Sequence, residues 1–153
     1  MPSRDSHYDV AIVGASIAGC AAAILYARRG LRVALAERNP DLNAYKRLCT
    51  HFIQASATPT IERLGLAGPL ERAGAVRNGG EFWTRWGWIR PPDTVENPRP
   101  WGYSIRRQKL DPLLRGMAVS TGGVDYFSGE SVLRAMRTNL MARGRSRRAT
   151  DPR

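Results

Sequence analysis

A short cluster of small residues between two apolar stretches constrains this chain more than any other feature. Residues 8–13 (YDVAIV) are short and rich in β-branched side chains, which predicts a buried strand. Residues 17–30 are Ala-rich and end on two arginines and a glycine, which predicts a helix. Between them stands the sequence Gly14-Ala15-Ser16-Ile17-Ala18-Gly19. A strand that turns through glycines directly into a helix is typical of sites where helix amides face phosphate groups.

The cluster is a GxSxxG version of the GxGxxG fingerprint, and each position has a mechanical reason. Gly14 allows the tight turn out of the strand, the second position lets the backbone approach a pyrophosphate, and Gly19 lets the helix lie close to the strand. Ser16 occupies the second position, where its small hydroxyl side chain can donate to a phosphate. The alternative is that these small residues serve packing alone, without a ligand.

The segment after the helix favours a ligand. Residues 31–37 (LRVALAE) predict a second buried strand, which ends on Glu37, 18 positions after Gly19. An acid about 20 residues beyond the glycines accepts hydrogen bonds from an adenosine ribose. The sequence therefore predicts a βαβ unit that binds the ADP part of a dinucleotide. The acid disfavours NADP, whose 2′-phosphate it would repel, although Arg38 softens that repulsion. FAD and NAD share the ADP half, so this unit leaves both open.

The uncharged run over residues 10–27 has 18 residues, which touches the lower limit for a membrane-spanning helix. The glycines near its middle, and the acids Asp5 and Asp9 before it, disfavour both a membrane span and a signal peptide.

Two cysteines, Cys20 and Cys49, are far apart and have no metal-like spacing, and the two histidines have no ligand-like partner. We therefore expect a cytoplasmic protein with no metal site and no membrane span.

The net charge of +11 raises the question of nucleic-acid binding. Residues 131–153 hold seven arginines and one acid, so this short tail carries over half of the excess charge. It has few apolar residues and no convincing period, which predicts a disordered, solvated tail over residues 134–153. The alternative is a non-enzymatic basic fragment whose tail binds nucleic acid. Nucleic acid is the less favoured partner because no aromatic residues alternate with the arginines.

The middle of the chain departs from a plain dinucleotide-binding pattern. After a loop, residues 58–74 predict one short apolar helix, and the aromatic-rich residues 81–89 (EFWTRWGWI) predict a strand of a separate antiparallel sheet. Residues 106–123 predict an amphipathic helix, and residues 124–132 a further strand. The apolar face of that helix comprises Leu110, Leu113, Leu114, Met117 and Ala118. The tryptophans could line a substrate or flavin pocket, but we favour a core position for Trp83, Trp86, Trp88 and Trp101.

The order of these motifs resembles FAD-dependent monooxygenases of the para-hydroxybenzoate hydroxylase type, together with their geranylgeranyl-reductase and halogenase-like relatives. The resemblance covers residues 8–133 and is carried by the glycine cluster, by Glu37, by an Arg-x-x-Leu-Asp motif at Arg107 and by a Gly-Val strand start at Gly123. It implies an α/β fold, with a Rossmann-like βαβ FAD-binding unit, an inserted partial antiparallel sheet on the substrate side, and an incomplete doubly wound domain. It assigns residues 1–38 and 105–133 to the FAD-binding portion and residues 39–104 to a partial substrate domain.

The resemblance further implies FAD as cofactor, a small organic substrate and NAD(P)H as reductant in a full-length relative. Arg107 would reach the FAD phosphate or ribose, while the flavin itself performs the redox step. Lys46 and Arg47 lie in a loop that passes near the flavin in relatives, with a solvated loop equally open. Cys49 and His51 lack a constellation for nucleophilic catalysis, so no catalytic residue is expected. The expected cofactor-binding residues are Gly14, Ala15, Ser16, Ile17, Ala18, Gly19, Glu37, Arg38 and Arg107.

Relatives of this type carry a second flavin motif with Gly-Asp farther along, and this sequence has none. We therefore expect a truncated, N-terminal portion of a flavin-dependent oxidoreductase that retains FAD weakly or not at all and does not turn over alone. An NAD-binding Rossmann module or dehydrogenase fragment is the alternative.

Overall fold

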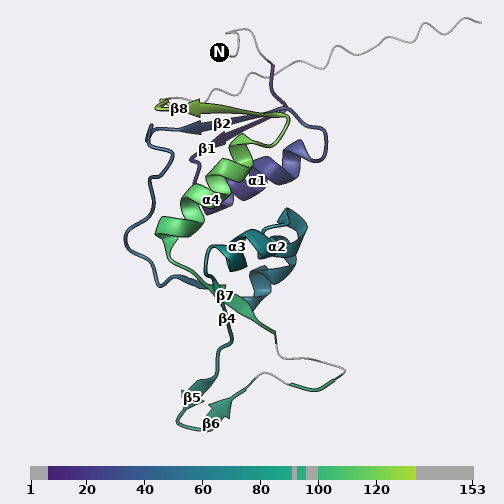
Figure 1. Cartoon of the computed structure of the whole chain (residues 1–153), viewed down its shortest axis with the longest axis vertical. Helices are drawn as coiled ribbons and strands as arrows, with labels where there is room; N and C mark the ends of the chain where they lie inside the picture. Colours follow the sequence, from purple (N-terminus) through teal and green to yellow (C-terminus); the bar gives the residue numbers. More distant parts are fainter. Residues whose placement is uncertain (1–6, 91–92, 96–99, 134–153) are drawn as a thin grey trace, which may run out of the picture.

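The computed structural model describes residues 7–90, 93–95 and 100–133. Three parallel strands form the sheet that organises the fold: β1 (Val10–Val13), β2 (Val33–Glu37) and β8 (Val124–Ser128), in the order β1-β2-β8 (Figure 1). In the register, Val10 lies opposite Val33, and Val33 lies opposite Val124. The two strands predicted around the glycine cluster and the third predicted near the end are all confirmed.

Two helices, α1 (Ile17–Ala27) and α4 (Arg107–Val119), lie together on one face of this sheet (Figure 1). Helix α1 connects β1 to β2, and α4 directly precedes β8. Parallel neighbours need such crossover connections. The predicted apolar face of α4 is confirmed, since Leu110, Leu114 and Ala118 are buried, while Leu113 and Met117 pack against the core from its edge. The mixed α/β class and the βαβ unit are therefore as expected.

The central segment adds a second small sheet and two short helices to the same core. Strands β3 (Phe52–Ile53), β7 (Gly102–Ser104) and β4 (Val76–Asn78) pair antiparallel in the order β3-β7-β4. Beside them, the 3-10 turn η1 (Ala55–Ala57) leads into α2 (Thr58–Leu64) and α3 (Ala67–Arg72).

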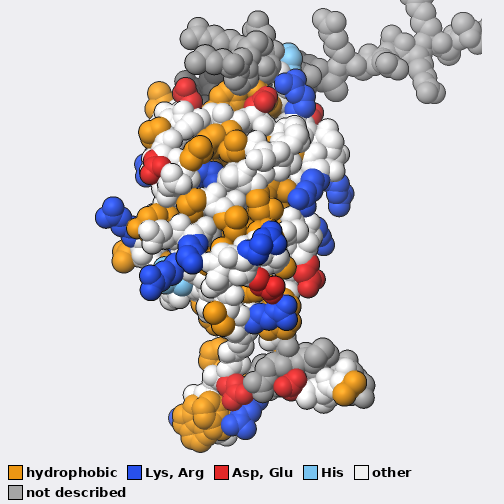
Figure 2. Space-filling model, in the orientation of Figure 1, with side chains coloured by type: hydrophobic (Ala, Val, Ile, Leu, Met, Phe, Trp, Pro, Cys, Tyr) orange, Lys and Arg blue, Asp and Glu red, His pale blue; other side chains and the backbone are white. Residues whose placement is uncertain are grey.

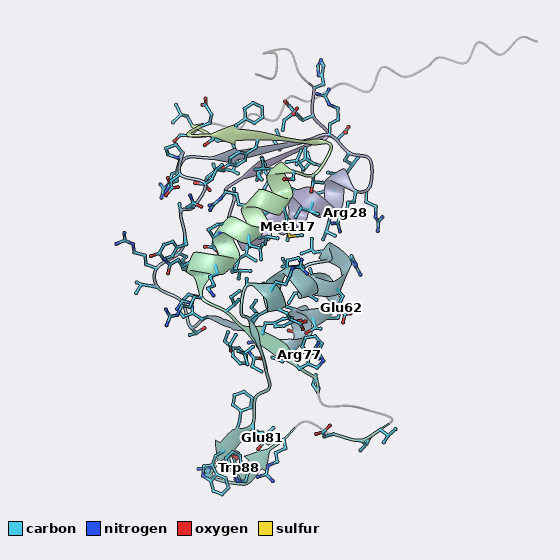
Figure 3. The ribbon with its side chains drawn as sticks, viewed as in Figure 1. Arg28, Glu62, Arg77, Glu81, Trp88 and Met117 are labelled. Carbon is cyan, nitrogen blue, oxygen red and sulfur yellow. The ribbon has the colours of Figure 1, made fainter. Side chains whose placement is uncertain are left out.

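The prediction of a single helix over residues 58–74 is wrong. Gly65 has φ 69°, a left-handed conformation that ends α2 and separates it from α3. The guanidinium of Arg28, just after α1, donates to the carbonyls of Arg63 at 2.9 Å and Leu64 at 3.0 Å (Figure 3). Arg28 therefore satisfies the free carbonyls at the end of α2 and fixes that helix against α1.

The single strand predicted over residues 81–89 is a hairpin of two short strands, β5 (Phe82–Thr84) and β6 (Gly87–Ile89). Its turn depends on Gly87, whose φ of 113° suits glycine, and on the Thr84 hydroxyl, which donates to the Gly87 carbonyl at 2.9 Å. The hairpin extends away from the helices, and Trp88 lies at its end, far from Met117 on α4 (Figure 3).

The expected core position is wrong for three of the four tryptophans. Trp83, Trp86 and Trp88 are 67%, 81% and 53% exposed, and the hairpin end carries a visible hydrophobic patch (Figure 2). The physical reason is that their predicted strand folds back on itself, so its rings contact each other instead of the core. Trp101 is partly buried and packs edge-on against Tyr103, with ring centroids 5.1 Å apart.

The predicted disordered tail over residues 134–153 lies outside the described residues. Within the described ranges, no helix is both long enough and apolar enough to cross a bilayer.

Candidate functional site

A cavity of about 440 Å³ opens at the carboxyl ends of β1 and β2, where the glycine cluster begins. Three of the predicted residues, Gly14, Glu37 and Arg38, line this cavity. Ligands of open α/β sheets bind outside the carboxyl ends of the strands, so the cavity stands where the fold places a cofactor. The remaining wall was not predicted as part of the site: Val13, Ala36, Glu130, Ser131 and Val132.

Both glycines of the fingerprint have the roles that the sequence assigned to them. Gly14 has φ 98°, a conformation that side chains rarely adopt, and its amide donates to the Ala36 carbonyl at 2.7 Å. A Cβ on Gly19 would lie 1.9 Å from the Gly14 carbonyl oxygen and 3.3 Å from the Ile12 side chain. Close approach of α1 to β1 therefore requires glycine at position 19.

The amino end of α1 follows directly on the glycine turn. The first amide to bond back along the chain is that of Cys20, which donates to the Ser16 carbonyl at 2.9 Å. The amides of Ile17, Ala18 and Gly19 precede it, and such first-turn amides have no partner within their own helix. Ser16 is the N-cap residue and is exposed, so its side chain leaves the helix start open to a ligand.

Glu37 ends β2, and its side chain lies beside the glycine turn. Its carboxylate accepts hydrogen bonds from the Ala15 amide at 2.8 Å and the Asn39 amide at 3.0 Å. Burial raises the pKa of Glu37, but the amides of Asn39 and Ala15, with the charges of Arg115 and Arg38, outweigh it and hold the pKa below its ordinary value. The Ala15 amide is thus engaged by Glu37, which is a role the fingerprint alone did not indicate.

Arg107 is buried beside the glycine cluster. It is 7% exposed, and its guanidinium donates to Asp111 Oδ1 at 2.6 Å and to Ser16 Oγ at 3.2 Å. Its place beside the fingerprint excludes the alternative of an ordinary surface arginine. A guanidinium at the N-cap of α1 can face a phosphate with the donors that remain.

The four loop residues discussed in the sequence, Lys46, Arg47, Cys49 and His51, divide into two groups. Lys46 and Arg47 are exposed, as a solvated loop would have them. Cys49 and His51 both contact Arg107: the Cys49 sulfur lies 3.9 Å from Nη1, and His51 Nδ1 accepts the Arg107 amide at 3.3 Å. These contacts hold the loop beside α4.

Arg115 is the residue of this region that sequence reasoning missed. It is 5% exposed, and its Nε donates to the Ala15 carbonyl at 3.3 Å. Its Nη1 donates to the carbonyls of Leu42 and, at 2.9 Å, Ala44. The available signal was its spacing, since it follows Arg107 and Asp111 at four-residue intervals along one helix.

A protein-family comparison identifies the unit that this geometry builds. The family model described as "FAD binding domain" matches residues 7–151. The chain belongs to this FAD-binding domain family. FAD is therefore the cofactor that the family match supports, in agreement with the resemblance seen in the sequence.

The curated relatives that this chain matches are several times its length. It is 36% identical over 146 residues to aklavinone 12-hydroxylase RdmE of Streptomyces purpurascens, covering 81% of this chain and 26% of that protein. It is 32% identical over 134 residues to squalene epoxidase 4 of Arabidopsis thaliana, covering 82% and 25%. The chain thus spans about a quarter of the length of these relatives.

Solved flavoprotein structures share its fold. The flavin-dependent brominase Bmp2 matches with a TM-score of 0.62 at 25% identity, over 79% of this chain and 29% of that one. PqsL of Pseudomonas aeruginosa matches with a TM-score of 0.64 at 20% identity, over 85% and 36%, a likeness of fold alone. The partial sheets of this chain therefore correspond to part of a larger flavoprotein architecture.

Proposed function

We propose that this chain holds the ADP half of FAD at the carboxyl ends of β1 and β2. The observation that supports this most directly is the Glu37 carboxylate, which accepts the Ala15 amide inside the glycine turn. The bond places one acid next to the turn that must approach the pyrophosphate. Two hydrogen bonds leave the carboxylate with further acceptor capacity, which an adenosine ribose can use.

Most of the predicted residues have a task in this proposal. The first-turn amides of Ile17, Ala18 and Gly19, reinforced by the helix dipole, attract the phosphates. Arg107 from α4 and Ser16 at the start of α1 would face the same phosphates, and Arg38, which lines the cavity, would lie near the ribose. Bound FAD would supply the redox chemistry, and these side chains bind and orient it.

We further propose that this portion serves a flavin-dependent oxidoreductase of the monooxygenase type, with a small organic substrate and NAD(P)H as reductant. The family match and the flavoenzyme relatives support this proposal. We propose the division made from the sequence, with residues 1–38 and 105–133 for FAD and residues 39–104 toward the substrate. Because the chain spans a quarter of its relatives, we expect no NADH or NADPH oxidation above that of free FAD.

Binding titrations test the cofactor. FAD, ADP, NAD and NADP should be titrated into the purified chain, with FAD bound more tightly than NAD and NADP most weakly because Glu37 repels its 2′-phosphate. Equal affinity for NAD and FAD would favour an NAD-binding module instead.

A matched pair of variants tests the site. Glu37→Gln should raise the FAD dissociation constant about tenfold, because hydrogen bonds to a charged group contribute about 1.5–3 kcal/mol. Glu62→Gln, on the exposed side of α2 (Figure 3), is the control and should leave the constant unchanged. Equal constants for the two variants would remove Glu37 from the site.

A further inference from the structure

Three charged side chains are buried along one face of α4. Arg107, Asp111 and Arg115 are 7%, 4% and 5% exposed, and four-residue spacing puts them on one side of the helix. Burying a charge is costly unless it is paired or hydrogen-bonded. A row of three buried charges on a helix that also packs its leucines in the core therefore points to specific contacts made by this face.

One set of contacts reaches the phosphate-binding turn. Arg115 Nε donates to the Ala15 carbonyl at 3.3 Å, and Arg107 Nη2 donates to Ser16 Oγ at 3.2 Å. The two arginines thus hold consecutive residues of the glycine cluster. Neither contact is local, since each joins positions about ninety or a hundred residues apart in the sequence.

The other set of contacts reaches the connection between β2 and β3. We call residues 42–49 of this connection the 42–49 segment. Arg115 Nη1 donates to the Leu42 and Ala44 carbonyls, and Asp111 Oδ2 accepts the Lys46 amide at 3.0 Å. These three bonds involve the main chain of the segment, so they fix its path whatever its side chains do. Figure 1 shows this connection running from β2 past α4 toward the small sheet that contains β7.

Arg115 joins the Ala15 carbonyl to two main-chain carbonyls of the 42–49 segment, whereas Arg107 joins the Ser16 hydroxyl to the Cys49 sulfur of that segment. All of the Arg115 bonds go to carbonyl oxygens, and a planar guanidinium with five donors can span several carbonyls at once. A lysine at this position would present one compact ammonium in place of the fork.

We propose that Arg115 is a positioning residue, which holds the 42–49 segment against the phosphate-binding turn and so prepares the cofactor site before FAD arrives. This inference rests on the proposed function, because it assigns Arg115 a part in FAD affinity. The benefit is pre-organisation: a segment already ordered loses less conformational freedom when the ligand binds. Arg115 itself stays buried behind Ala15 and acts through the segment and the turn.

The test uses the full chain with Arg115→Met and Arg115→Lys, and with Lys109→Met as the control. Lys109 is an exposed cation on the same helix that donates to the Ala73 carbonyl, away from the cofactor site.

Amide hydrogen exchange is measured without ligand, and FAD affinity is measured by titration. We expect Arg115→Met to speed exchange in residues 42–49 at least tenfold, with β1 and β2 unchanged, and to raise the FAD dissociation constant about tenfold. Arg115→Lys should recover part of both effects, and Lys109→Met should match the wild type.

The possible failures are distinguishable. Unchanged exchange in the 42–49 segment of Arg115→Met overturns the inference, and so does faster exchange throughout the sheet with unchanged FAD affinity, because that pattern indicates a purely structural role. If Arg115→Met does not fold, Arg115→Lys decides by the same two measurements. If the wild type binds no FAD, the proposed function fails, while the exchange data still decide whether Arg115 holds the segment.

Discussion

The parallel-sheet half of the molecule and the β5–β6 hairpin both carry large apolar side chains, yet they bury them very differently. In the sheet half, Leu35 of β2 and Leu110 and Leu114 of α4 are at most 2% exposed. They are buried because α1 and α4 cover one face of the sheet. In the hairpin, the aromatic rings remain largely exposed, with Trp86 at 81%. The comparison teaches that alternating apolar residues predict a strand, whereas burial depends on a second element that covers it.

The hairpin compensates for its exposure with contacts of its own. Trp83 and Trp88 form an edge-on pair with ring centroids 5.3 Å apart, and the Arg85 guanidinium lies 4.1 Å from the Trp86 ring centroid. Such contacts contribute about 0.5–1.5 kcal/mol each, much less than a fully packed core position. The two regions should therefore respond to substitution on different scales.

The largest effect is expected in the buried face of α4. Leu114→Ala should lower the free energy of unfolding by about 4 kcal/mol, because it removes core contacts and leaves a cavity. Urea denaturation of the variant and the wild type measures the change. A loss below about 1 kcal/mol would mean that α4 does not form the core of the sheet half, and the comparison would fail.

The contact between α1 and β1 should be almost as sensitive. Gly19→Ala places a Cβ 1.9 Å from the Gly14 carbonyl oxygen, so we expect a loss of about 3 kcal/mol and of FAD binding. Gly116→Ala is the matched control, because nothing lies within 4 Å of a Cβ at that helical position. It should stabilise the chain by about 0.5–1 kcal/mol in the same denaturation experiment. Similar losses in both variants would contradict the close approach at Gly19.

The acid at the cofactor site should make stability depend on pH. The pKa of Glu37 is lowered in the folded chain, so its contribution is fully present above the ordinary value of 4.5 and is lost as pH falls through the folded pKa. The difference in unfolding free energy between wild type and Glu37→Gln should therefore shrink below pH 4.5. A hairpin variant such as Trp86→Ala should track the wild type over the same range. A difference that grows toward acid pH would contradict the hydrogen bonds assigned to Glu37.

The smallest effect is expected at the hairpin end. Trp86→Ala should change the free energy of unfolding by less than about 0.5 kcal/mol, because the ring is exposed and surface substitutions rarely cost more. Thermal or urea unfolding beside Leu114→Ala measures the contrast directly. A loss above about 2 kcal/mol would show that the hairpin rings are buried, as the sequence had suggested.

The features that the sequence predicted well are local. Gly14, Gly19 and Glu37 are related by short spacings along one βαβ unit, so their roles follow from turn geometry and strand length. The leucine face of α4 follows from helical period alone. The turn at Gly14, the close approach at Gly19 and the buried leucines of α4 are as the sequence predicts, while the role of Glu37 toward a ribose stays a prediction.

The features that the sequence missed depend on contacts between distant segments. Arg115 acquires its partners only when Ala15 and Leu42 fold against α4, and nothing near it in the sequence identifies them. The exposed hairpin was missed because its turn lacks the usual Asn-Gly or Asp-Gly pair. The break at Gly65 was missed because a glycine inside an apolar run can be tolerated within a helix as well as end one, and its left-handed φ shows that it ends α2.

The most direct test of the central claim is an NMR titration of the ¹⁵N-labelled chain with millimolar ADP and then FAD, which detects weak binding as well as tight. We predict chemical-shift changes for both ligands at the amides of Ile17, Ala18, Gly19 and Glu37, with residues 82–89 of the hairpin unchanged. The absence of changes at these amides, or changes confined to the hairpin, would contradict a cofactor site at the carboxyl ends of β1 and β2.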